Sequence, residues 1–307
     1  MQDDILYWLA STKLPEFAIE DALLVLGKFG SLKTAWKADK EVLKGIKGSQ
    51  RLSKAILNHK SPSIIDECKE IVNWAEKESI HIIPYMSQDY PRLLREANNP
   101  PPTLFVKGDP KIMHNKTIAM VGTRDPSEYG KSASRRIASE LVRLGYVVVS
   151  GLAFGIDESA HKGVLDEDGL TIAVLASSVD NVTPKSNKEL ANNILRGGGC
   201  LVSEYGPKEP IRRGNFVERN RIIAGLSNAT IVVEGTKNSG TRHQATYAKE
   251  MERPIFVVEP ENREIEQAEL PLILIDEGAI SVRSGPEAVR ELWMTRLDKG
   301  ETELKAA

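Results

Sequence analysis

Thr117-Ile-Ala-Met-Val-Gly-Thr-Arg124 is the stretch of the chain that decides its fold. An apolar run ends in a glycine and leads into a loop of small residues, and the same order returns at Tyr146–Asp157 and at Thr230–Thr241. Loops that follow parallel strands meet at one edge of an open α/β sheet, where ligands bind. Helix N-termini at that edge present free N–H groups and a positive dipole end. The sequence therefore predicts a phosphate-facing site built from several loops.

Strands and helices alternate from residue 117 onward. We expect strands at 117–122, 146–150, 171–176, 200–204, 230–234, 254–259 and 279–282, and helices at 128–144, 156–166, 187–196, 217–226, 241–251 and 286–297. The strands are continuous apolar runs, which is typical when helices cover both faces of a sheet. The pattern predicts an α/β protein with a doubly wound parallel sheet.

The first part of the chain has a different pattern. Residues 4–60 show apolar residues at helical spacing, with glycines between short segments. Phe29–Leu32 and Leu43–Gly48 resemble turns of a sterile-alpha-motif or helix-hairpin module. We expect an all-helical domain over residues 1–78, an extended Rossmann-like domain over 79–290, and a helix end with a polar tail over 291–307. The helical domain suits either packing against a partner or direct DNA contact.

Composition limits the classes of function. A net charge of −2 over 307 residues excludes a polycation, so any nucleic-acid binding must come from a local patch. Two cysteines, Cys68 and Cys200, are too few for a disulfide framework, and we expect buried thiols in a reducing compartment. No apolar run approaches the ~18–20 residues of a membrane span. The first residues lack the basic stretch of a signal peptide, so we expect a cytoplasmic protein.

The first strand-end loop carries an arginine. Gly122 permits a tight turn and close ligand approach. Arg124 can fork onto a phosphate, or it can pair with a neighbouring carboxylate. Gly122 to Gly130 does not spell G-x-G-x-x-G, and Asp125 stands where a P-loop needs glycine. Neither NAD nor Mg-ATP is therefore indicated, and we expect no cofactor.

The second loop and a later lysine add candidates. Gly151 and Gly155 let the backbone approach a ligand. Asp157 and His161 lie one helical turn apart, which is too few ligands for a metal site. We expect Asp157 to be a helix N-cap and His161 a partly buried hydrogen-bonding residue. Lys185 either reaches a phosphate at the same crevice or is a solvated loop lysine.

The strongest local charge lies at 211–221, which holds four arginines and one glutamate. Phe216 lies among them, where it suits stacking on a base, and Asn220 adds a donor. Arg219 and Arg221 cannot share one helix face. We therefore expect one of them in the crevice and the other paired elsewhere.

The third loop opens a helix with Ser239-Gly-Thr241, whose hydroxyl and N–H groups suit phosphate. Gln244 stands where a hydrolase using this loop would place a carboxylate. An amide cannot take a proton, so the residue favours binding over hydrolysis.

Together these motifs resemble the DNA-processing protein A family (DprA, also called Smf). The resemblance covers roughly residues 1–297. It rests on several motifs in the right order, namely Asp89-Tyr-Pro91, Pro101-Pro102, Leu104-Phe-Val-Lys-Gly108, Gly122-Thr-Arg124, Tyr129-Gly130, Ser150–Asp157, Ala160-His161, Ser203-Glu-Tyr205, Phe216, Arg219–Leu226 and Ser239-Gly-Thr241.

The resemblance implies an extended Rossmann fold that binds single-stranded DNA, forms homodimers and loads a RecA-type recombinase during natural transformation, without catalysis. By motif, Arg124 and Lys185 would contact DNA phosphates. The complete set expected at the DNA site is Gly122, Thr123, Arg124, Gly151, Phe154, Gly155, Lys185, Phe216, Arg219, Asn220, Ser239, Gly240 and Thr241.

The chain departs from the family pattern in places. It has Gly-Thr-Arg for Gly-Ser-Arg, Thr183-Pro184 for Tyr-Pro, Phe216-Val-Glu218 for Phe-Pro, and Val258-Glu-Pro260 for Val-Pro-Gly. We expect no C-terminal winged-helix domain, since the sequence ends at Ala307.

Two other functions stay open. LOG-type phosphoribohydrolases bind nucleotides at equivalent loops, where they resemble Gly-Gly-x-Gly-Thr-x-x-Glu and this chain has Asn238–Gln244. A nucleotide-binding or nucleotide-cleaving protein is therefore the alternative to a DNA binder. A partner-recruiting scaffold with a vestigial site is the third.

Overall fold

The computed structural model describes residues 2–44 and 50–298, which form two compact units. The first unit comprises Met1–Ser87 with Pro102–Leu104, and the second comprises Gln88–Pro101 with Phe105–Ala307. All the residues expected at the DNA site belong to the second unit.

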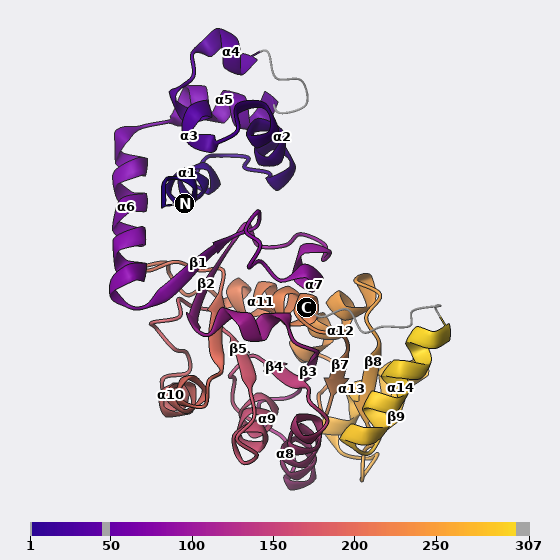
Figure 1. The fold of residues 1–307 in the computed structure, drawn as a ribbon. Coiled ribbons are helices and arrows are strands. Elements are labelled where there is room, and N and C mark those ends of the chain that lie inside the picture. Colours follow the sequence, from indigo (N-terminus) through magenta and orange to yellow (C-terminus); the bar gives the residue numbers. More distant parts are fainter. Residues whose placement is uncertain (1, 45–49, 299–307) are drawn as a thin grey trace. The chain divides into compact units, whose positions relative to one another are not determined.

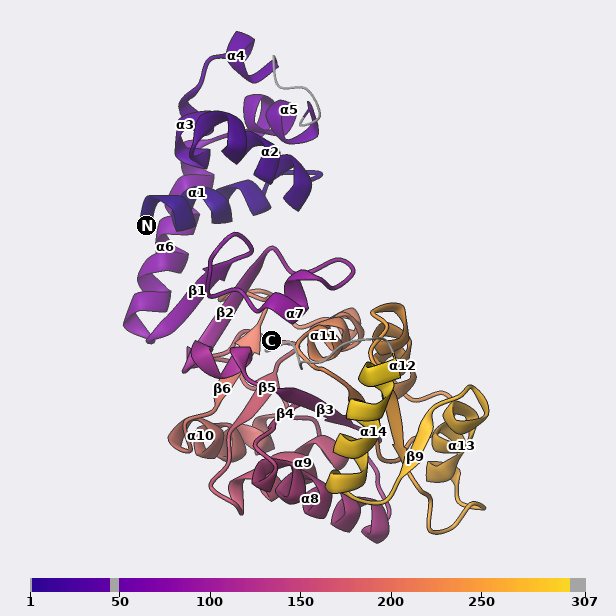
Figure 2. The same cartoon turned by 45° about the vertical axis from the view of Figure 1, so that its right-hand side comes forward.

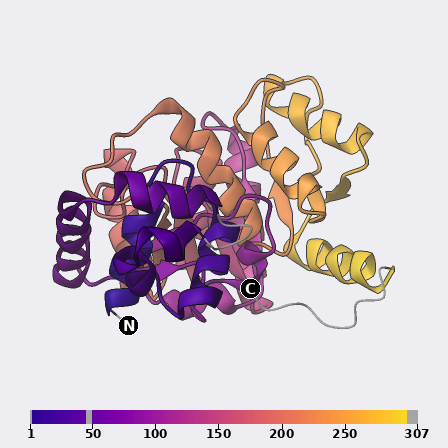
Figure 3. The same ribbon diagram turned by 90° about the horizontal axis from the view of Figure 1, so that it is seen from above.

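The first unit is mainly helical (Figures 1 and 3). Its elements are α1 (Gln2–Thr12), α2 (Ile19–Phe29), α3 (Leu32–Lys37), α4 (Lys40–Lys44), α5 (Gln50–His59), α6 (Pro62–Lys77) and β1 (Ile80–Pro84). The predicted turn after Phe29 is present, with Gly30 left-handed at φ 72° and Ser31 capping α3 through Thr34 N. The predicted turn at 43–48 lies mostly outside the described residues. Trp8 is fully buried, and its indole N–H donates to Pro102 O at 2.8 Å.

The second unit is built on a mixed sheet that is parallel except at one pairing. Its strands are β2 (Thr103–Gly108), β3 (Thr117–Val121), β4 (Val147–Ser150), β5 (Thr171–Val174), β6 (Cys200–Ser203), β7 (Thr230–Val232), β8 (Ile255–Val258) and β9 (Ile280–Val282). The order of the nine-stranded sheet is β1-β2-β6-β5-β4-β3-β7-β8-β9. The strands from β6 to β9 pair in parallel, whereas β2 runs antiparallel to β6. The predicted extended Rossmann-like sheet is confirmed.

Helices cover both faces of this sheet (Figures 1 and 2). One layer holds α8 (Glu128–Arg143), α9 (Ile156–Leu165) and α10 (Lys188–Arg196), with α14 (Gly285–Asp298) packed on α8; the other holds α11 (Arg213–Gly225) packed on α12 (Thr241–Glu250). The remaining helices are α7 (Arg92–Arg95), α13 (Glu269–Asp276) and the short 3-10 turns η1 (Pro110–His114), η2 (Lys185–Asn187) and η3 (Glu266–Ala268).

The core explains the continuous apolar strands. Ile118, Met120, Val148 and Ile231 are fully buried in one cluster with the inner faces of the helices. In register, Ala119 lies opposite Val149 on one side and opposite Thr230 on the other. A strand with helices over both faces has no solvent side, so it has no polar alternation.

The topology fixes where a ligand can bind. The connection through α8 leads from β3 to β4, whereas α11 connects β6 to β7 on the other side of β3. The strand order therefore reverses around β3, and the crevice of a doubly wound sheet opens at such a reversal, beyond the carboxyl ends of the strands.

Two helices differ from expectation. α11 begins at Arg213, four residues before the expected start, so most of the arginine-rich segment is helical. α13 was not predicted, because its apolar run Leu270–Ile275 has no helical alternation and contains Pro271.

Candidate functional site: a pocket beyond the strand ends

A cavity of about 400 Å³ lies beyond the carboxyl ends of β3 and β7. It is lined by Val121, Gly122, Thr123, Arg124, Ala153, Asp157, Phe216, Val217, Arg219, Asn220, Ile223, Ser239, Gly240, Thr241 and Gln244. The structure therefore brings together residues from all three strand-end loops and from α11. Four expected site residues are not in its lining, namely Gly151, Phe154, Gly155 and Lys185.

The first loop is held close to its neighbours. Thr123 N donates to Glu234 O at 2.8 Å. A Cβ on Gly122 would come within 2.5 Å of Ile156 and 2.9 Å of Glu234 O, so only glycine fits. Arg124 is exposed, and its guanidinium lies over the Phe216 ring at 5.3 Å from the centroid. The contact is a cation–π pair at the mouth of the cavity.

Glu234 supports this loop, although the sequence analysis did not single it out. It is buried at the end of β7, and its carboxylate accepts from Ser127 N at 2.8 Å and from Ser127 Oγ at 2.5 Å. Ser127 Oγ in turn accepts from Gly130 N, so Ser127 is the N-cap of α8. The sequence signal that could have identified Glu234 is an acidic residue directly after the apolar run of β7.

Asp157 is not the N-cap that its position predicted. Gly155, at φ 78°, occupies the N-cap of α9, and Asp157 lies inside the first turn with 5% of its surface exposed. Its Oδ2 accepts from Gly151 N at 3.2 Å and from Ala153 N at 3.4 Å. The carboxylate therefore folds back and orders the preceding loop.

The two glycines of the second loop, Gly151 and Gly155, are required by close packing within the protein. A Cβ on Gly151 would overlap the guanidinium of Arg219, and a Cβ on Gly155 would lie 2.5 Å from Thr123 O. Packing is one reason for both glycines, because the side chain of Arg219 and the first loop occupy the space that a Cβ would need. That they also let a ligand approach stays a prediction.

Arg219 and Arg221, both on α11, have separate partners, as expected. Arg219 lines the cavity with 5% of its surface exposed, and its Nη1 donates to Val174 O at 2.7 Å. Arg221 instead pairs with Glu204 at 2.5 Å, with both side chains largely buried. Only Arg219 therefore contributes to the cavity.

Two buried charges face each other in the cavity wall. Burial lowers the pKa of Arg219 and raises the pKa of Asp157, and in each case the charge of the other residue opposes the shift. The nearby charge of Arg124 lowers the pKa of Arg219 further. The side chains of Arg124 and Arg219 thus converge on the cavity, and the negative charge of Asp157 partly offsets their positive charge.

His161 lies behind this wall and is fully buried. Its Nδ1 is 2.8 Å from Thr171 Oγ1, which confirms the predicted hydrogen bond, although the ring is fully and not partly buried. Burial lowers the pKa of His161 to about 3, so the ring is neutral.

α11 also positions the third loop. Asn220 Nδ2 donates to Gly240 O at 3.2 Å, directly before α12. Gln244 is buried; its amide nitrogen, oriented toward α11, lies 2.7 Å from Asn220 O, and its oxygen lies 3.2 Å from Ala224 N. Asn220 and Gln244 therefore connect the two helices.

The third loop leaves donors facing the cavity. No side chain caps the first turn of α12. The N–H groups of Arg242 and His243 donate to Ser239 O and Gly240 O at 3.0 and 3.2 Å, which leaves the N–H of Thr241 for a ligand. Ser239 Oγ and Arg219 Nε are buried and have no hydrogen-bond partner in the described part of the chain. Buried donors without a partner are costly, and an anion would satisfy them.

Lys185 and Phe154 flank the cavity rather than line it. Lys185 is exposed at the start of η2, and Asn187 in the same turn donates to Leu152 O at 3.0 Å. Phe154 is 45% exposed on the loop that follows Leu152. The lysine turn is therefore held on the loop that carries Phe154.

Further findings concern metals, membranes and thiols. Within residues 2–44 and 50–298, no group of three or more acidic, histidine or cysteine side chains is placed to hold a metal ion. No helix in the same ranges is both long enough and apolar enough to span a bilayer. Cys68 and Cys200 are buried free thiols, as predicted, and burial raises the pKa of Cys68 to about 11.

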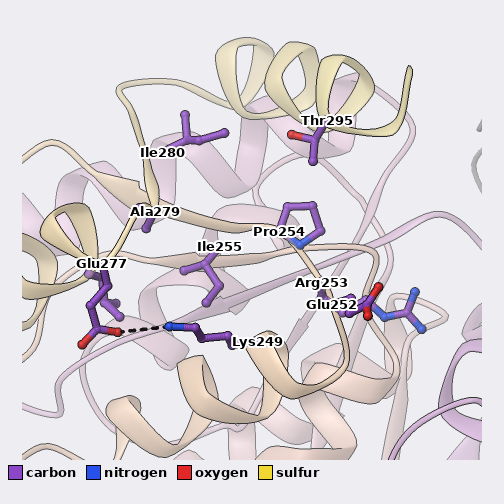
Figure 4. Close-up of a pocket in the computed structure, with 11 residues that line it drawn as sticks. Lys249, Glu252, Arg253, Pro254, Ile255, Glu277, Ala279, Ile280 and Thr295 are labelled. Carbon is purple, nitrogen blue, oxygen red and sulfur yellow. Dashed lines mark ion pairs between the residues drawn. The ribbon is translucent and has the colours of Figure 1, made fainter. Parts of the chain in front are cut away.

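A second cavity, of about 390 Å³, lies at the amino ends of β8 and β9, where it is bounded by α12, α13 and α14. Figure 4 shows Lys249 paired with Glu277 at 3.8 Å beside Pro254, Ile255 and Ile280. Its lysine is paired with a carboxylate, and the cavity lies at the strand ends opposite to the three loops, so the first cavity is the better anion site.

Comparison with known proteins agrees with this geometry. The family model described as DNA recombination-mediator protein A matches residues 81–293. DNA processing protein DprA of Bacillus subtilis is 34% identical over 264 residues, covering 84% of this chain and 88% of that protein.

Two solved structures have the same fold. DNA processing protein A of Streptococcus pneumoniae superposes with a TM-score of 0.73 at 29% identity, over 93% of this chain and 97% of that one. DNA processing protein A of Helicobacter pylori, described with its single-stranded DNA binding mode, gives a TM-score of 0.62 at 26% identity, over 70% and 96%. The matched motifs, the strand order and the pocket at the reversal of the sheet together place this chain in the DNA recombination-mediator protein A (DprA/Smf) family.

Proposed function

We propose that this protein binds single-stranded DNA through the strand-end cavity. The observation that carries the proposal is the convergence of Arg124, Arg219 and the N-terminus of α12 at Ser239–Thr241 on one cavity. A phosphate there would satisfy Ser239 Oγ and Arg219 Nε, which have no partner in the described residues. The Helicobacter pylori relative, whose description names single-stranded DNA binding, supports the same ligand.

The flanking residues suit a strand that continues beyond one phosphate. Phe216 lies at the mouth with Arg124 over its ring, and Phe154 is partly exposed on the neighbouring loop. Aromatic faces accept any base by stacking. Lys185, exposed on the turn held to that loop, would contact a second phosphate.

The family resemblance supports finer proposals. We propose that the protein is not an enzyme, acts in the cytoplasm as a homodimer, and passes the bound strand to a RecA-type recombinase. Residues 1–78 would form an accessory helical domain. The buried amide of Gln244, in place of a carboxylate, supports binding without hydrolysis.

Fluorescence anisotropy with an oligo-dT series tests the proposal. Arg124→Ala with Lys185→Ala should weaken binding at least about tenfold and reduce the magnitude of the slope of log K against log salt by about 1.4, since each phosphate contact on a single strand contributes about 0.7.

A matched control separates the site from net charge. Arg143→Ala with Lys249→Ala removes the same two charges from exposed ion pairs with Glu167 and Glu277, away from the cavity. Exposed pairs contribute little to stability, so this variant should bind like the wild type. Equal loss in both double variants, or loss in neither, would exclude the cavity as the DNA site.

A further inference from the structure

The wall of the cavity contains a carboxylate, which a phosphate site does not obviously need. Among the described residues that line the cavity, Asp157 supplies the one acidic side chain. It is 95% buried, so little solvent screens its charge from the interior of the cavity. A bound phosphate would be repelled by it.

Arg219 is the cation beside Asp157. Its guanidinium lies against Gly151, where a Cβ would overlap it, and the Gly151 N–H donates to Asp157 Oδ2. The guanidinium of Arg219 and the carboxylate of Asp157 therefore both lie next to Gly151. The charge of each opposes the pKa shift that burial imposes on the other.

The hydrogen bonds of Asp157 do not require its charge. Two are donated by the backbone N–H groups of Gly151 and Ala153, at 3.2 and 3.4 Å, and the Ser150 hydroxyl supplies a further one. An asparagine side-chain oxygen would accept the same bonds. A neutral residue at position 157 could therefore order the second loop equally well. Loop ordering alone does not explain why the side chain carries a negative charge.

We propose that Asp157 is an internal counter-charge that balances Arg219 and holds the affinity of the cavity for a phosphodiester below what its arginines would give. This inference rests on the proposed function and specifies how the same site is tuned. Arg124 is then the exposed cation that acts on the strand without a buried counter-ion.

Charge-neutral variants at two positions test the balance by oligo-dT anisotropy. Asp157→Asn should tighten binding by about threefold to tenfold at low salt, since it removes a repulsion and leaves Arg219 uncompensated. Arg219→Gln should weaken binding. The double variant should return to within about twofold of the wild type, because it removes the pair as a whole.

Asp168→Asn is the matched control. It follows α9 in the same unit, is exposed, has φ 49° that asparagine tolerates, and changes net charge equally. It should leave affinity unchanged. Circular dichroism melting establishes that each variant is folded, and Asp157→Ser offers a second way to remove the charge if Asp157→Asn does not fold.

Several outcomes would overturn the counter-charge. They are unchanged or weaker binding by a folded neutral variant, an equal gain in Asp168→Asn, or failure of both neutral variants to fold, which would make the charge a requirement of the fold.

A second readout separates this inference from the proposed function. Sodium phosphate, compared with sodium chloride of equal ionic strength, should raise the melting temperature of Asp157→Asn more than that of the wild type. If the wild type binds no oligonucleotide and the phosphate effect is present, the DNA function fails and the counter-charge stands. If DNA binds the wild type and neither readout improves in Asp157→Asn, the counter-charge fails alone.

Discussion

The arginines of the cavity differ in their environment, and with it in what they can do. Arg124 is exposed over Phe216, whereas Arg219 is buried, donates to Val174 O and faces Asp157. An exposed guanidinium can change its conformation to contact a phosphate, whereas a buried guanidinium acts from a fixed position. The sequence predicted that both arginines belong to the site. It could not predict that Arg219 is buried, because that depends on its contacts with Gly151 and Val174, which are distant in sequence.

Gln244 tests whether the site is a reaction centre with one group missing. We expect Gln244→Glu to lower the free energy of unfolding by about 1–3 kcal/mol, because a carboxylate cannot donate to Asn220 O. The variant should release no free base from nucleoside monophosphates, measured by chromatography. The exposed Gln88→Glu is the control for stability. Base release by Gln244→Glu would support the nucleotide-cleaving alternative.

His161 should make stability depend on pH. Its pKa is about 3 in the folded protein and about 6.5 when unfolded, so below pH 6.5 only the unfolded chain takes up the proton. The stabilisation is complete above pH 6.5 and is lost as the pH falls, by about 2 kcal/mol at pH 5.

Urea unfolding at pH 7.5 and pH 5.0 measures this loss. His161→Asn keeps a donor toward Thr171 but does not titrate, so the wild type should lose about 2 kcal/mol more than the variant between the two values. The same pH dependence in both proteins would show that His161 does not stay neutral in the fold.

At the scale of elements, α11 organises the site. It carries Arg219 into the cavity, holds the third loop through Asn220 and Gly240, and presents Phe216 to Arg124. The helix needs space on the second loop, which Gly151 provides. The strand-end loops depend on one another through this helix.

Gly151→Ala should therefore destabilise the protein by about 2–3 kcal/mol, because the added Cβ overlaps a buried guanidinium that has a hydrogen bond to lose. Gly214→Ala, on the same α11, meets nothing within 4 Å and should change stability by less than about 1 kcal/mol. Chemical denaturation gives both values. A tolerant Gly151 would mean that Arg219 moves freely.

The elements that could be predicted from sequence are those whose pattern is local. Neighbouring residues are enough to indicate the strands that run up to Gly122, Ser150 and Glu234. The same holds for the helix N-caps at Ser31 and Ser127. The acid of Glu234 under the first loop, the fold-back of Asp157 and the apolar α13 depend on partners distant in sequence. Nine of the thirteen expected site residues line the cavity: six lie in loops that follow strands, and Phe216, Arg219 and Asn220 lie on α11, whose arginine-rich pattern is also local.

At the scale of the whole molecule, binding is a local property. The chain carries a net charge of −2, so long-range attraction to DNA is weak and affinity must come from the cavity and its rim. Residues 259–307 carry six basic against twelve acidic side chains, which makes that part an unfavourable DNA surface. The described site lies within the second unit.

Photo-crosslinking of a 5-iodouracil oligonucleotide, followed by tryptic mapping, tests the central claim most directly, because it reports where the strand lies. We predict crosslinks on the peptide Gly214–Arg219, which contains Phe216, and on Leu144–Lys162, which contains Phe154. Excess unlabelled oligo-dT should remove both, and Arg124→Ala with Lys185→Ala should reduce both. Crosslinks confined to the first unit or to α14, with neither peptide labelled, would contradict the assignment of the strand-end cavity as the DNA site.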